Sequence, residues 1–120
     1  MSRSELIRES GLTENQLREL EEYGVLQGQR STAGTWYSDD ALRIASVAAR
    51  FFRFGIEPRH LRAFKTAATR EAELYKQLVA PVHTQRNTQA RMESMARLEE
   101  LTGLGSTLRD ELLRSALRSS

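Results

Sequence analysis

The sequence predicts a mostly α-helical fold, in which a helix-turn-helix with a small β wing is followed by additional packed helices. Three observations lead to this prediction. Only two prolines and seven glycines occur among 120 residues, so long stretches can stay helical. Two short amphipathic segments are separated by a tight glycine turn. A polar, glycine-containing stretch that ends in aromatic residues follows them and is typical of a short hairpin.

The helix-turn-helix is predicted over residues 4–24. Ser4 can cap a first helix that runs to about residue 10, and Gly11 permits the turn after it. Thr13 and Gln16 have the spacing of a capping box, in which each side chain bonds the backbone of the other residue. Gly24 ends this second helix, so both helices have start and stop signals of their own.

The third helix, about residues 39–54, follows the wing and is the most apolar segment of the chain. Ser38 is its predicted cap. We expect it to be the central core helix, with Ile44, Val47 and Phe51 buried. Its polar positions share one face: Arg43, Ser46, Arg50 and Arg53. We prefer to interpret this face as solvated, although a track for phosphates is the alternative.

The C-terminal half is predicted to be a series of shorter helices. Pro58 suits the first turn of a fourth helix, and Pro81 should kink or break its continuation. A further break is expected at Gly103 and Gly105, with Ser106 capping a last helix. Because no heptad pattern persists across these interruptions, we expect packing onto the core rather than a coiled-coil dimer. The predicted domains are residues 1–68 and residues 69–120, in one globular unit.

The composition excludes several classes of function. There is no cysteine, so thiolate metal sites and cysteine nucleophiles are absent, and the two histidines, His60 and His83, are too few for a metal centre. No phosphate-binding glycine loop or nucleophile elbow occurs, which predicts that the chain is not an enzyme and needs no cofactor. The lack of a long apolar run and of a secretion signal predicts a cytoplasmic protein with no membrane partner.

Charge is unevenly distributed along the chain. Residues 5–22 hold six carboxylates and two arginines, a local charge of −4, whereas residues 41–70 hold seven bases and one acid, a local charge of +6. An anionic partner should therefore meet the middle of the chain. The predicted basic partner surface comprises Arg43, Arg50, Arg53, Arg59, Arg62 and Lys65.

A second candidate surface is aromatic. Four residues, in the wing and at the end of the third helix, can line an apolar groove for a peptide or small molecule: Trp36, Tyr37, Phe51 and Phe54. The alternative is that these side chains simply belong to the core.

Three blocks of the sequence carry a family resemblance. The first block consists of residues 11–13 (Gly-Leu-Thr) and residues 17–26. The second covers residues 30–40 and includes Tyr37, Ser38 and two aspartates, and the third covers residues 55–61. Their spacing resembles the MerR family of bacterial transcription regulators. Residues 55–64 look like the C-terminal domain of an actinobacterial MerR-like regulator of cell-division genes. That resemblance implies a separate N-terminal DNA-binding domain and a second helical domain that is a diverged copy of it.

The chain departs from the MerR pattern at positions that the resemblance assigns to phosphate contacts. Glu19 and Leu20 stand where the family has two aromatic residues, and Thr35 and Trp36 stand where the wing has an arginine. Since phosphate contacts supply most of the affinity for DNA, the resemblance implies a degenerate winged helix-turn-helix.

These observations favour a non-enzymatic regulatory domain of a MerR-like transcriptional regulator, which binds a protein, a peptide or a small effector. DNA would then be contacted by the full-length regulator. The alternative is direct, sequence-specific DNA binding through Thr13, Asn15, Gln16 and Arg18 in the major groove and Arg30 on the wing. A third reading is a small homodimeric sensor with a non-metal ligand.

Overall fold

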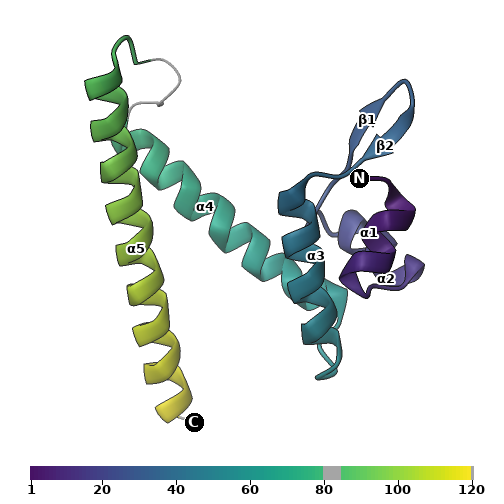
Figure 1. Ribbon diagram of the computed structural model, residues 1–120. Helices are drawn as coiled ribbons and strands as arrows, with labels where there is room; N and C mark the ends of the chain where they lie inside the picture. The colour runs from purple at the N-terminus through teal and green to yellow at the C-terminus, as the bar shows by residue number, and fades with distance from the viewer. Residues whose placement is uncertain (80–84, 120) are drawn as a thin grey trace. The chain divides into compact units, whose positions relative to one another are not determined.

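The computed structural model describes residues 1–79 and 85–119 of the chain (Figure 1). The chain divides into two compact units, Met1–Ala67 and Ala68–Ser120, with a boundary beside the predicted one. The described residues form five α-helices, one 3-10 helix and a two-stranded sheet, which confirms the mostly helical class with a small wing. The expected packing of the second unit on the first stays a prediction. Two predictions concern residues outside the described ranges: the helix kink at Pro81 and the lack of a metal-binding role for His83.

Helices α1 (Arg3–Ser10) and α2 (Glu14–Glu22) form the predicted helix-turn-helix. The cap of α1 is Ser2 rather than Ser4, because the Ser2 side chain accepts a hydrogen bond from the Glu5 backbone. The turn between the helices needs Gly11, whose φ of 84° is rarely adopted by other residues. The predicted capping box at the start of α2 is confirmed. Leu17 and Leu20 of α2 are fully buried.

Strands β1 (Gln29–Ser31) and β2 (Gly34–Trp36) form the wing, an antiparallel hairpin in which Arg30 lies opposite Thr35. The hairpin extends away from the helices of its unit (Figure 1), and all of its strand residues are exposed. Tyr37, which follows β2, is buried, and its backbone exchanges two 2.7 Å hydrogen bonds with Met1. The end of the wing is thereby fixed to the start of the chain.

Helix α3 (Asp39–Phe52) is central to the core, as predicted, but it buries a different face. Its buried residues are all alanines: Ala41, Ala45, Ala48 and Ala49. The prediction that Ile44 and Val47 are buried is wrong, because these side chains are 41% and 56% exposed. Side-chain size sets the distance between packed helices, so a face of alanines lets α3 lie close to α1. The larger apolar side chains are consequently left outside.

A 3-10 helix, η1 (Pro58–Leu61), joins α3 to α4 (Arg62–Leu78). The predicted helix start at Pro58 is therefore a tighter turn, in which the His60 ring accepts a 2.9 Å hydrogen bond from the Glu57 backbone. Leu61 reaches the core of the first unit. That core joins both helices of the helix-turn-helix to α3 and η1, and its members are Leu6, Leu12, Leu17, Leu20, Val25, Leu26, Tyr37, Ala41, Ala45, Ala48, Ala49 and Leu61.

The second unit contains α5 (Thr88–Arg118), a single helix capped by Asn87. The predicted break at Gly103 and Gly105, with a new cap at Ser106, is wrong. Each glycine costs a helix about 1 kcal/mol relative to alanine, and two such costs do not stop a helix of 31 residues. No residue within Thr88–Arg118 is buried, so α5 presents its apolar side chains largely to solvent.

Candidate functional site

The exposed face of α2 carries two of the side chains predicted to enter the major groove, Asn15 and Arg18. Arg18 donates a hydrogen bond to the Asn15 side chain, and Asn15 donates a 3.4 Å hydrogen bond to Glu19. Glu22 lies one further turn along and shares this face, given its spacing from Asn15 and Arg18. The face therefore combines one cation with two carboxylates.

The other predicted DNA-contact residues are placed differently. Thr13 and Gln16 are engaged with each other's backbone: the Gln16 N–H donates to the Thr13 hydroxyl at 3.0 Å, and the Thr13 N–H donates to Gln16 Oε1 at 2.9 Å. Arg30 is not on α2 but on strand β1 of the wing, where it is exposed. The structure thus ties two of the five residues into a helix cap and leaves Asn15, Arg18 and Arg30 at the surface.

A polar network that joins α2 to α1 and to Tyr37 was not predicted. Tyr37 donates a 2.7 Å hydrogen bond to Glu21, and Arg3 donates to Glu21 at 2.7 Å and to the Tyr37 hydroxyl at 2.8 Å. Arg3 also pairs with Glu14 at 2.8 Å. The network holds α1, α2 and the end of the wing in one arrangement. It could not be predicted from sequence patterns, because its members lie far apart along the chain.

The network changes the acidity of its members. Burial raises the pKa of Tyr37 above its ordinary value, and the hydrogen bond to Glu21 raises it further. Burial alone would lower the pKa of Arg3, but its bonds to Glu21 and Glu14 outweigh this effect and raise it. Both groups therefore keep their protons at neutral pH, and the network is one cation shared between two carboxylates.

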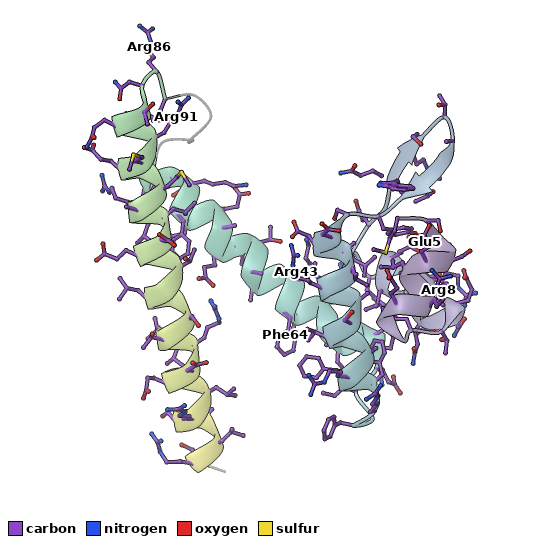
Figure 2. All side chains as sticks on the ribbon, in the orientation of Figure 1. Glu5, Arg8, Arg43, Phe64, Arg86 and Arg91 are labelled. Atoms are coloured by element: carbon purple, nitrogen blue, oxygen red, sulfur yellow. The ribbon has the colours of Figure 1, made fainter. Side chains whose placement is uncertain are left out.

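The predicted basic surface is only partly available for a partner. Arg43, on α3 (Figure 2), pairs with Asp40, and Arg59 pairs with Glu57 at 2.8 Å. The remaining members are exposed and form no ion pair within the described residues: Arg50, Arg53, Arg62 and Lys65. These four side chains are free of internal ion pairs and can meet an external anion.

The four predicted groove residues are not all brought together. Tyr37 is in the core, and Trp36 is 57% exposed on the wing. Phe51 and Phe54 do line an open hollow of about 420 Å³. Their partners there are Val47, Arg50 and Ile56. The sequence signal for Val47 was its helical spacing from Phe51 and Phe54, which was instead assigned to the core.

Two further kinds of site were searched for in residues 1–79 and 85–119. No helix in these ranges is both long and apolar enough to cross a membrane. No group of three or more histidine or acidic side chains in the same ranges is arranged to hold a metal ion.

The comparisons with known proteins agree on one family. The Rv1828-like C-terminal domain matches residues 1–120. Similar proteins include the HTH-type transcriptional regulators Rv1828 of Mycobacterium tuberculosis and Mb1859 of Mycobacterium bovis. Each is 31% identical over 118 residues, which are 98% of this chain and 47% of the relative, so the chain spans about half the length of these curated relatives. The chain belongs to the Rv1828-like C-terminal domain family.

Proposed function

We propose that this chain is a regulatory domain of a MerR-like transcriptional regulator and acts through contacts with another protein or an effector rather than with DNA. Its relatives are HTH-type transcriptional regulators, and this chain corresponds to about half of their length. The full-length regulator would then contact DNA through another part of its chain.

The observation that supports this proposal most is the bonding on the face of α2. Arg18 is bonded to Asn15, and Asn15 to Glu19, so the base-reading side chains are engaged with each other and with a carboxylate. A duplex would have to break these bonds and accept Glu19 and Glu22 near its phosphates. Repulsion between carboxylates and phosphates opposes binding, and phosphate contacts normally supply most of the affinity.

Direct DNA binding remains the second candidate. Asn15 and Arg18 are exposed on the second helix of a helix-turn-helix, and Arg30 is exposed on the wing. Asparagine and arginine are the side chains that most often pair with adenine and guanine edges. The hydrogen bonds between them are at the surface and can exchange for bonds to a base.

Selection from a pool of random DNA duplexes, followed by fluorescence anisotropy over a salt series, separates the two functions. For a regulatory domain we expect no enriched sequence and only weak binding, with Kd near the nonspecific range of about 10⁻⁶ to 10⁻⁴ M. The variants Arg18→Ala and Arg91→Ala should then behave alike, since Arg91 is an exposed arginine of α5. An enriched motif whose binding is lost in Arg18→Ala but kept in Arg91→Ala would establish DNA binding instead.

A further inference from the structure

The outer face of α3 carries an apolar stripe that lies mostly outside the core, where only Phe51 is half-buried. Its residues in α3 have the spacing that aligns side chains along one side of a helix, and Phe54 follows in the turn after α3: Ile44, Val47, Phe51 and Phe54. Val47 is 56% exposed and Phe54 is 86% exposed. Phe64 (Figure 2), at the start of α4, extends the stripe. Its ring centroid lies 5.7 Å from that of Phe51. Contiguous apolar surface of this kind marks an interaction site more often than chance exposure does.

The shape of this stripe suits a helix. From Ile44 to the end of α3 at Phe52 it covers nine residues, or about 13 Å at 1.5 Å per residue, and Phe54 in the following turn lengthens it. Its C-terminal half is hollowed into the open space of about 420 Å³ beside Phe51 and Phe54. A small ligand normally needs a site that encloses most of its surface, whereas a helix lies in an open groove and inserts side chains from one face.

The charges around the groove indicate the character of its partner. Arg50 lines the hollow, and Arg53, the next exposed residue, caps the C-terminal end of α3. Arg62 and Lys65 flank Phe64 in α4. None of these four cations forms an ion pair in the described part of the chain, while the nearby acid Glu57 is already paired with Arg59. An apolar groove with unpaired cations beside it complements apolar residues flanked by carboxylates.

We propose that the α3 groove binds an acidic amphipathic helix of a protein partner. Its apolar side chains, spaced three and four residues apart, occupy the stripe and the hollow, and its carboxylates meet Arg50, Arg53 and Lys65. The inference rests on the proposed function, because it specifies the partner of an interaction domain. It adds the place of contact and the chemistry of the partner.

The test uses the full chain and a labelled designed peptide of about 14 residues, with leucines at helical spacing and glutamates on both flanks. Two matched peptides are needed: one with lysine for every glutamate, and one with the acidic composition in scrambled order. We expect saturable binding of the acidic peptide, at least about tenfold weaker binding of both others, and a loss of affinity with salt.

Variants of exposed residues locate the contact without disturbing the core. Phe54→Ala and Arg50→Glu should each weaken peptide binding about tenfold. Leu112→Ala and Arg118→Glu, which change exposed side chains of α5 in the same ways, should leave it unchanged. Circular dichroism that matches the unchanged chain shows that each variant is folded.

Three results would overturn the proposal: no saturable binding of the acidic peptide, equal binding of the lysine peptide, or equal loss with the α5 variants. A fourth is sedimentation showing a dimer that Phe54→Ala dissociates, because a second copy would then occupy the groove. The random-duplex selection is scored independently. An enriched DNA motif would count against the proposed function, whereas failure of the peptide with no DNA motif removes only the helix partner.

Discussion

The backbone of Gly105 in α5 lies directly against the Tyr75 hydroxyl of α4. A Cβ added at Gly105 would overlap this hydroxyl and the Glu71 carboxylate. Tyr75 donates a 2.6 Å hydrogen bond to Glu71, and Arg109 of α5 pairs with the same carboxylate. The missing side chain at Gly105 therefore makes room for the polar contact that joins the two helices of the second unit.

Gly105 and Gly103 should respond differently to alanine, although both lie inside α5. Gly103→Ala should stabilise the chain by up to about 1 kcal/mol, since no atom lies near the added methyl group. Gly105→Ala gains the same helix propensity but must displace the Glu71–Tyr75 pair. We expect it to be about 1 kcal/mol less stable than Gly103→Ala in urea unfolding followed by circular dichroism. Equal midpoints for the two variants would show that the pair adjusts without cost.

Removing the cap of α2 should destabilise the first unit. Thr13→Ala deletes the hydroxyl that accepts the Gln16 N–H, a change that typically costs about 1 kcal/mol. Thr32→Ala, in the turn of the wing, alters an exposed threonine that caps no helix and should cost much less. Urea unfolding measures both. A loss in Thr32→Ala as large as that in Thr13→Ala would argue against the capping box.

The Tyr37 network should make the protein sensitive to alkali. The pKa of folded Tyr37 is raised, first by burial and then by Glu21, whereas an unfolded tyrosine titrates near pH 10. The stability linked to this group is therefore fully present below about pH 10 and is lost as the pH rises through the folded pKa. Tyr37→Phe should lose about 1 kcal/mol at neutral pH, and its free energy of unfolding should decline less steeply as the pH rises above about 10.

The control for this experiment is Tyr23→Phe. It leaves the Tyr37 network intact and should retain the alkaline loss of stability. Urea midpoints at several pH values provide the comparison. If Tyr37→Phe and Tyr23→Phe decline equally with pH, the alkaline loss arises outside the network.

Reversing one charge on α2 should restore part of a DNA-binding surface. Glu22 is exposed on the face that holds Asn15 and Arg18. Glu22→Lys should raise nonspecific affinity for duplex DNA several-fold at low salt and make the salt dependence steeper by about one ion. Glu93→Lys on α5 changes the net charge equally and should have a smaller effect. Anisotropy titrations in which both variants gain equally would mean that only total charge matters.

The helix-turn-helix could be predicted from the sequence because its determinants are local. The Thr13–Gln16 box and the left-handed Gly11 each act within a few residues, so a pattern in the chain is enough to find them. The wing was found in the same way, from its glycines and the aromatic residues at its end.

The candidate sites were harder to predict because they depend on packing. Hydrophobicity placed Ile44 and Val47 inside, but the close approach of α3 and α1 selects alanines for the interior. The contact of Arg3 with Tyr37 joins residues 34 positions apart, and no spacing rule connects them. The prediction of a helix break at Gly103 was wrong, because the free-energy cost of two glycines is small compared with the stability of the long helix that surrounds them.

The alanine face of α3 has a consequence for how this domain can vary. A library that varies residues 39–54 and is selected only for folding should keep Ala45 and Ala48 small while replacing Val47 and Phe54 with polar residues, because solvent already reaches these two side chains. The same library selected for gene regulation in a cell should keep the outer residues apolar as well. Positions that are constrained only in the second selection would be those required for regulation, whereas positions constrained in both would be those required for folding.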